Sequence, residues 1–188
     1  MTAESNLVPM RIPETLSSDR LLLRPWRLED AAFAFDLYSR WEVARFLGRT
    51  PAVMTDPADA RRLVARLTAL EDDLRCFRVA ELAASGEPVG TVMLQPIPAS
   101  GPSEPLRPSG DTEIGWHFHP GHWGHGYASE AAGLLLDTAL ADGLPRVVAV
   151  TYPGNTASQR VCERIGMRHL GQSDAYYNVR MELFAREA

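Results

Sequence analysis

The segment from Trp116 to Glu130 constrains the fold most, because it joins a strand-like run to a helix-like run through a glycine turn. Gly124 and Gly126 have no Cβ, so the backbone can turn sharply there and approach a ligand closely. The residues after them are small and apolar, as in a packed helix. Because the first N–H groups of a helix lack intrahelical partners and lie at the positive end of its dipole, this turn predicts a site for a pyrophosphate.

A second block, Asn155 to Met167, predicts a helix with defined ends. Asn155 is a favourable N-cap, and Gly166 can supply the left-handed residue that stops the helix. Between the two blocks, Arg146 to Thr151 is an apolar run short enough for a buried strand. A lone glycine turn is a weak indication of a binding site, but two such blocks in this order are much more specific.

Together the two blocks resemble the GNAT N-acetyltransferase family. The run Trp123-Gly-His-Gly-Tyr-Ala128 resembles the acyl-CoA pyrophosphate loop of that family, whose usual form is Gln/Arg-x-x-Gly-x-Gly/Ala. Gly126 and Ala128 take the two fixed small positions, and the Asn155 block resembles the helix beside the pantetheine arm. Trp123 stands where Gln or Arg is usual, which is familiar in the RimJ/RimL-like branch. The resemblance covers nearly all of the chain apart from a proline-rich stretch.

The resemblance implies an α/β GNAT fold, with a mixed, mostly antiparallel central sheet of about six to seven strands flanked by about four helices. The residue pattern also predicts mixed strands with helices between them. Helices are expected to begin near residues 28, 55, 127 and 155, and Thr55-Asp56-Pro57 is a plausible capped start for the second of them. Strands are expected at residues 20–25, 75–82, 88–94, 112–119, 146–151, 167–171 and 178–184.

Residues 1–188 are expected to form one domain, since domains usually run ~100–200 residues. Within it, residues 96–111 carry five prolines and two glycines. Because proline has no backbone N–H, this segment is predicted to be a long surface loop inserted between two core strands. Residues 41–51 are expected to be a flexible segment on the substrate side, as in such a fold.

Composition limits the class of protein. Hydrophobic residues make up 45% and charged residues 23% of the chain, which favours a globular protein. No apolar run approaches the ~20 residues needed to cross a bilayer, and no secretory signal is recognised, so a cytoplasmic protein is expected. The net charge of −5 argues against nucleic acid as the main partner and suits a cationic amine.

The two cysteines, Cys76 and Cys162, are interpreted as reduced thiols packed in the core. For Trp26, Trp41 and Trp116, two interpretations stay open: they line an apolar pocket, or they belong to the core.

Acyl transfer from a thioester to an amine needs a held cofactor, a neutral amine and a group that assists the departing sulfur. Glu113 is the candidate base because it lies on the strand that leads to the glycine turn, where related enzymes often place an acid. In an unbroken strand it would share a face with Gly115, His117 and His119, although a bulge, common here in the family, would change that parity. The alternative is that Glu113 is a solvated residue or a structural ion-pair partner.

Ser158 is the candidate acid or sulfur-orienting residue. Many relatives carry a tyrosine seven residues after the asparagine, but here that position holds Cys162. Ser158 matches a serine in RimL-like relatives that can hydrogen-bond the cofactor sulfur. Three alternatives stay open: Ser158 as an ordinary surface residue, Cys162 as the acid or as inert packing, and water as the proton donor.

Four histidines lie in the same region: His117, His119, His122 and His125. No Asp, Glu or Cys recurs nearby at ligand spacing, so a metal site is not predicted. The backbone from Trp116 to His119 is instead expected to pair with the pantetheine amide, as an added strand would. The imidazole of His117 or of His119 is an alternative base.

The resemblance therefore implies transfer of acetyl from acetyl-CoA to a primary amine by direct attack in a ternary complex. The acceptor is a protein N-terminal α-amine or a small-molecule amine, and the enzyme is a monomer or homodimer with no metal, nucleic-acid or membrane partner. The alternative is a non-catalytic acyl-CoA-binding sensor, while an oxidoreductase is disfavoured because a further spaced glycine and a downstream acid are missing. The residues expected to bind the cofactor are Trp116, His117, Phe118, His119, Trp123, Gly124, His125, Gly126, Tyr127, Ala128, Ser129, Asn155 and Ser158.

Overall fold

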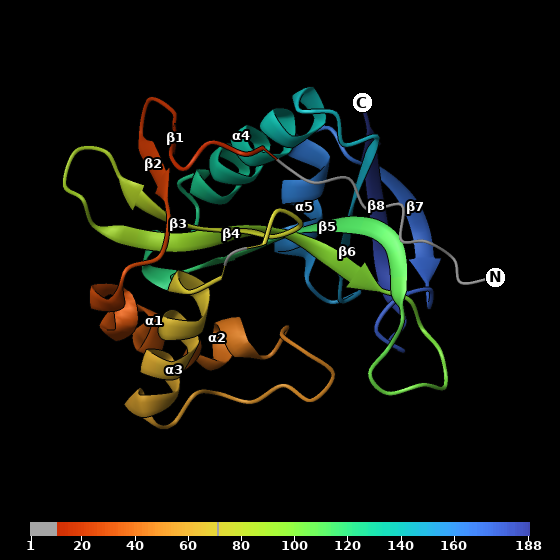
Figure 1. The fold of residues 1–188 in the computed structure, drawn as a ribbon, viewed down its shortest axis with the longest axis horizontal. Helices are drawn as coiled ribbons and strands as arrows, with labels where there is room; N and C mark the ends of the chain where they lie inside the picture. Colours follow the sequence, from red (N-terminus) through yellow and green to blue (C-terminus); the bar gives the residue numbers. More distant parts are fainter. Residues whose placement is uncertain (1–10, 71) are drawn as a thin grey trace.

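The computed structural model describes residues 11–70 and 72–188, and its centre is one sheet of eight strands in the order β1-β2-β3-β4-β5-β6-β8-β7 (Figure 1). Neighbouring strands are antiparallel except β5 and β6, which are parallel. The predicted mixed, mostly antiparallel α/β fold is thus confirmed, and the strand beyond the expected six to seven is the very short β1. The strands are β1 (Leu16–Ser17), β2 (Leu21–Arg24), β3 (Cys76–Leu82), β4 (Pro88–Pro98), β5 (Pro108–Phe118), β6 (Arg146–Thr151), β7 (Arg168–Ser173) and β8 (Met181–Glu187).

Helices cover both faces of the sheet, with α4 and α5 on one face and α1, α2 and α3 on the other (Figure 1). The one-turn helix α2 begins the segment 41–51, so that segment is not entirely loop. None of the described helices is long and apolar enough to cross a membrane. The helices are α1 (Ala31–Tyr38), α2 (Trp41–Ala44), α3 (Pro57–Thr68), α4 (Tyr127–Ala141) and α5 (Thr156–Arg164), with short 3-10 turns η1 (Leu28–Asp30) and η2 (Pro120–His122).

The predicted caps of α3 and α5 are present. Asp56 accepts a hydrogen bond from the Ala58 N–H at 2.8 Å, with Pro57 as the first helical residue. Asn155 accepts a hydrogen bond from the Ser158 N–H at 3.3 Å. Each cap satisfies an N–H that has no partner within its helix, so these short signals fix where α3 and α5 begin.

The largest buried cluster lies between the sheet and α4. Ile114 and Phe118 of β5 belong to it together with Leu135 and Leu136 of α4. Truncation of one such leucine to alanine typically costs about 2–5 kcal/mol of stability. The cluster therefore holds the N-terminal end of α4 at a fixed place beside the end of β5.

The Pro-rich segment is more regular than predicted. β4 extends through Pro98 and β5 begins at Pro108, so the loop spans residues 99–107 rather than about 96–111. The pairing of the two strands shifts register between Pro96 and Pro98. Such an irregularity accommodates residues that cannot donate a backbone hydrogen bond, which is why the prolines do not end the strands.

This loop packs against the connection between β7 and β8. The Ser100 N–H donates to the Ala175 carbonyl at 2.7 Å. The Asn178 side chain accepts from the Gly101 N–H at 2.8 Å and donates to the Gly101 carbonyl at 3.0 Å. Tyr177 and Asn178 both have left-handed backbone, with φ of 58° and 54°. The loop thus fixes a turn that non-glycine residues adopt only with local support.

Candidate active site

Strands β5 and β6 separate after a short parallel pairing. They pair only at Thr112 with Val147 and at Glu113 with Val148, although both strands continue further. The space between the separated ends opens into a cavity of about 760 Å³, which we call the splay cavity. Its walls come from β5, β6, the loop before α4, the first turns of α5 and the segment after α2.

The N-terminal end of α4 opens into this cavity. Gly124 and Gly126 have φ of 82° and 81°, a conformation that favours glycine, and Gly126 is the N-cap without a side-chain cap. The Glu130 N–H donates to the Gly126 carbonyl at 3.0 Å. The N–H groups of the preceding turn lie ahead of this hydrogen bond and have no acceptor within the helix. The Ser129 hydroxyl in that turn is buried and has no hydrogen-bond partner within residues 11–70 and 72–188. Donors and a helix dipole therefore suit an anion here.

Two side chains hold the loop before α4 in place. The Trp123 indole Nε1 donates to the Phe118 carbonyl at 2.8 Å, which ties the loop to the end of β5. Arg20 Nη1 donates to the His125 carbonyl at 3.0 Å, and Arg20 Nε donates to Glu130 at 2.8 Å. Arg20 was not predicted, because no local pattern connects it to a loop that lies about a hundred residues later in the chain.

All the predicted cofactor residues line the splay cavity except two, His119 and His125. His119 Nε2 lies 3.0 Å from Asp36 instead, and the His125 ring stacks on Tyr127 with centroids 5.5 Å apart. Both side chains leave the cavity because the chain turns away after β5 and again at the glycines. The predicted residues that do line it are Trp116, His117, Phe118, Trp123, Gly124, Gly126, Tyr127, Ala128, Ser129, Asn155 and Ser158.

Glu113 lies in the cavity wall where β5 and β6 part. The Tyr177 hydroxyl donates to Glu113 Oε2 at 2.5 Å, and Gln95 Nε2 lies 3.4 Å from the same oxygen. Burial raises the pKa of Glu113, while these two hydrogen bonds lower it by less. Burial and the Glu113 carboxylate also raise the pKa of Tyr177, so the phenol keeps its proton. Tyr177 was not predicted, since nothing local in the sequence marks it.

The strand parity around Glu113 follows the simple alternation. The pairing of β4 and β5 is regular from Gly90 with Phe118 to Pro96 with Thr112, and its irregularity lies beyond that point. Glu113 and His117 therefore lie on the same face of β5. That face is the one covered by α1, α2 and α3, because the alternate residues of β5 pack toward α4.

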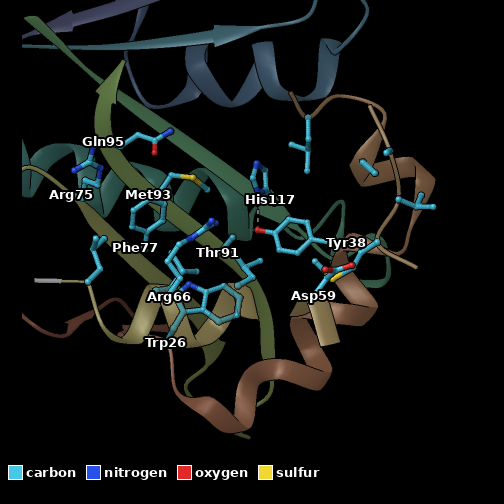
Figure 2. Close-up of a pocket in the computed structure, with 18 residues that line it drawn as sticks. Trp26, Tyr38, Asp59, Arg66, Arg75, Phe77, Thr91, Met93, Gln95 and His117 are labelled. Atoms are coloured by element: carbon cyan, nitrogen blue, oxygen red, sulfur yellow. Dashed lines mark hydrogen bonds between the residues drawn. The ribbon is translucent and has the colours of Figure 1, made fainter. Parts of the chain in front are cut away.

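His117 is held as a neutral group. Its Nδ1 lies 3.0 Å from the Tyr38 hydroxyl, and Figure 2 shows that hydroxyl directed at the ring. Burial lowers the pKa of His117 to about 4, so it is unprotonated at neutral pH. Such a weak base is a poorer proton acceptor than Glu113. No cluster of three His, Cys, Asp or Glu side chains suited to a metal is found in the described part of the chain.

Ser158 and Cys162 have different surroundings although both lie on α5. Ser158, in the first turn, lines the splay cavity. Cys162 belongs to the main buried cluster, and burial raises the pKa of its thiol to about 12. Cys162 is therefore a packing residue, in line with the reduced core thiol that was expected, and Ser158 is left as the candidate donor on this helix.

Comparison with known proteins agrees with this geometry. Residues 20–168 match the family described as Acetyltransferase (GNAT) domain. The uncharacterized N-acetyltransferase p20 of Bacillus licheniformis is 30% identical over 161 residues, which cover 84% of each chain. An acetyltransferase from Agrobacterium tumefaciens has a TM-score of 0.72 at 25% identity, with 96% of this chain and 98% of that chain covered.

A second structure, AAC(6')-Ib in complex with ribostamycin and coenzyme A, has a TM-score of 0.71 at 20% identity, with 90% of this chain and 94% of that chain covered. At this identity the likeness shows the fold alone. The activity class, acetyltransferase, is shown by the family match over most of the chain and by the relative in Bacillus licheniformis. The chain belongs to the GNAT acetyltransferase family and is an acyl-CoA-dependent acyltransferase.

Proposed function

We propose that this chain is a single-domain N-acetyltransferase of the RimJ/RimL-like branch, which transfers acetyl from acetyl-CoA directly to a primary amine. The acceptor is a protein N-terminus or a small-molecule amine. One observation carries the proposal: the splay cavity joins the open N-terminus of α4, Glu113 and Ser158 in one space. A cofactor anchor, a base and a hydroxyl donor in one cavity are what direct transfer in a ternary complex requires.

The residues around the cavity fit coenzyme A. The N–H groups before Glu130 and the unpartnered Ser129 hydroxyl would hold its diphosphate. The edges of β5 and β6 beyond Glu113 and Val148 would take the amide groups of the pantetheine arm, since they do not pair with each other there. Acetyl-CoA supplies the thioester whose carbonyl carbon is attacked.

Glu113 would take the proton from the substrate ammonium. Its pKa is raised by burial, which makes the carboxylate a stronger base than an exposed glutamate. The neutral amine then attacks, so that the C–N bond forms, the C–S bond breaks and the second proton of the attacking nitrogen passes to the departing thiolate. Ser158 would orient the sulfur or relay this proton to it, since it lines the same cavity.

Coenzyme A titration by calorimetry tests the anchor. Ser129→Ala is expected to weaken binding by roughly 10-fold or more, because a hydrogen bond to a charged group is worth about 1.5–3 kcal/mol. The unfolding free energy should stay nearly unchanged, since the hydroxyl has no protein partner within the described residues. Ser85→Ala, in the exposed turn between β3 and β4, is the control and should leave the Kd unaltered.

Thiol release with a panel of peptides and small amines tests the transfer. Turnover with at least one primary amine is expected. Tight coenzyme A binding with no turnover on any amine would favour the non-catalytic sensor. A natively folded protein that gives no heat with coenzyme A would overturn both functions.

A further inference from the structure

A second cavity, of about 650 Å³, lies between α3 and the sheet, and we call it the α3 cavity (Figure 2). It shares Leu47, Met93, Gln95 and His117 with the splay cavity, so the two spaces meet at these four residues. Gln95 also contacts the Glu113 carboxylate. A molecule in the α3 cavity would thus have one end beside the candidate base.

The walls of the α3 cavity are mostly apolar. Trp26, Phe77 and Leu67 form much of the wall, and Met54 and Met93 add flexible side chains that adapt to a ligand's shape. The Trp26 indole N–H in the wall is buried without a hydrogen-bond partner within the described residues, whereas two other polar groups of the wall have partners. The Thr91 hydroxyl donates to the Arg78 carbonyl at 2.8 Å, and His117 is neutral and bonded to Tyr38. The interior therefore suits an uncharged, apolar body.

The charges around this cavity do not favour a second cation. Asp59 is the one acid among the described residues that line it, and Asp59 is already paired with Arg62. Arg75 also lines it and is paired with Asp72, whereas Arg66 lines it without an ion pair among the described residues, so the local charge is positive. A buried ammonium without a counter-ion is costly, because it loses its hydration.

We propose that the α3 cavity binds the acceptor substrate, and that this acceptor is a primary monoamine with an aromatic or branched apolar body. This inference rests on the proposed acetyl transfer. The apolar body lies against Trp26, Phe77 and Leu67, and the single amine reaches the junction of the two cavities, where Glu113 takes its proton. Polycationic amines are poor acceptors, because their further ammonium groups would enter an apolar space that already carries positive charge.

A matched pair of amines tests the class of acceptor. 4-Methylbenzylamine and p-xylylenediamine both carry an aminomethyl group on a benzene ring. In the diamine a second aminomethyl group, which is an ammonium at neutral pH, takes the place of the methyl group. The monoamine is expected to have a kcat/KM on the order of 100-fold higher, because the diamine must bury an unpaired charge. Leu63→Glu places a carboxylate in the wall and should bring the two values to within roughly 10-fold.

A second variant tests the location. Ala52 is exposed and lines the α3 cavity, so Ala52→Trp should narrow it and raise the KM for 4-methylbenzylamine about 10-fold or more while the Kd for coenzyme A is unchanged. Ala65 is an exposed residue of α3 outside the cavity lining, and Ala65→Trp is the matched control with unchanged KM.

The outcomes separate the two claims. Equal or better turnover of the diamine, or an unchanged KM in Ala52→Trp, overturns the acceptor assignment while acetyl transfer stands. Absence of turnover with every amine, despite coenzyme A binding, overturns the proposed function and the acceptor assignment with it. Preference for the monoamine, lost in Leu63→Glu and weakened in Ala52→Trp but not in Ala65→Trp, supports the assignment.

Discussion

At the residue scale, Glu113 and Tyr177 form the pair on which the proposed chemistry depends. Their hydroxyl to carboxylate contact of 2.5 Å joins side chains that are 64 positions apart in the chain. The sequence indicated Glu113 because its strand leads to the glycine turn. Tyr177 and Arg20 could not be predicted, because their partners are brought near only by the sheet order, and one sequence contains no record of such long-range pairs.

Replacing the carboxylate tests its role directly. Glu113→Gln keeps the shape of the side chain and removes the base, so kcat/KM should fall about 10²–10⁴-fold at neutral pH. In the wild type, activity should fall on the acid side with a midpoint above the ordinary glutamate value, since burial raises the pKa of Glu113. That acidic limb should vanish in the variant, while the Kd for coenzyme A is retained. A variant with an unaltered pH profile would remove Glu113 from the mechanism.

Tyr177→Phe tests whether the Tyr177 hydroxyl acts on the Glu113 carboxylate or only supports the fold. The hydroxyl stabilises the charged carboxylate and so lowers the pKa of Glu113 against the effect of burial. Its loss should raise that pKa further and move the acidic limb of the pH profile to higher pH. The pH profile of kcat/KM measures this shift. A loss of activity without a shift would mean that Tyr177 only supports the turn.

At the element scale, the loop at residues 99–107 acts as a clamp on the turn that carries Tyr177. The prolines around it suggested an irregular insertion, and the interpretation was wrong at both ends because β4 and β5 continue into it. Strand pairing uses the N–H groups of alternate residues, so prolines fit where a ladder bond is not required or where the register shifts. The caps at Asp56 and Asn155, by contrast, could be predicted because they are local.

Asn178 tests the clamp. Asn178→Ala removes two hydrogen bonds to Gly101 and places alanine at a φ of 54°, so it should cost about 2–3 kcal/mol of unfolding free energy in urea and lower kcat. Asn178→Gly removes the same bonds but tolerates the backbone. It should therefore recover part of the stability. Equal stability of both variants and the wild type would show that the loop does not hold the turn.

At the scale of the whole molecule, the strand and helix order was predictable, whereas the two cavities were not. Apolar periodicity and turn residues mark each element separately. The shape of a cavity depends on how far two strands diverge and on which side chains lie outside the space between them. His119 and His125 are two residues that do not line the splay cavity. The glycine turn was therefore identified correctly as a loop before α4. Which of the neighbouring side chains line the cavity, and which lie outside it, could be learned only from the structure.

Coenzyme A is expected to stabilise the folded protein when it binds. Coenzyme A at 100 times its Kd should stabilise the native state by about 2.7 kcal/mol and raise the Tm by roughly 5–11 °C. Ser129→Ala at the same concentration should show a smaller rise, because its Kd is weaker. A thermal melt with and without coenzyme A measures both, and an identical Tm in the wild type would contradict binding to the native state.

The short pairing between β5 and β6 has a mechanical consequence. The ladder between β5 and β6, which joins the part of the sheet from β1 to β5 with the part from β6 to β8, has two residue pairs, and an isolated bridge pairs Ala99 with Tyr176. The backbone ladder is thin at this seam, and α4 packs in one buried cluster with residues of both β5 and β6. A ligand bound in the gap would contact both β5 and β6, and would help to set the angle between two parts of the sheet that are otherwise joined by this short ladder and by the loop at residues 99–107.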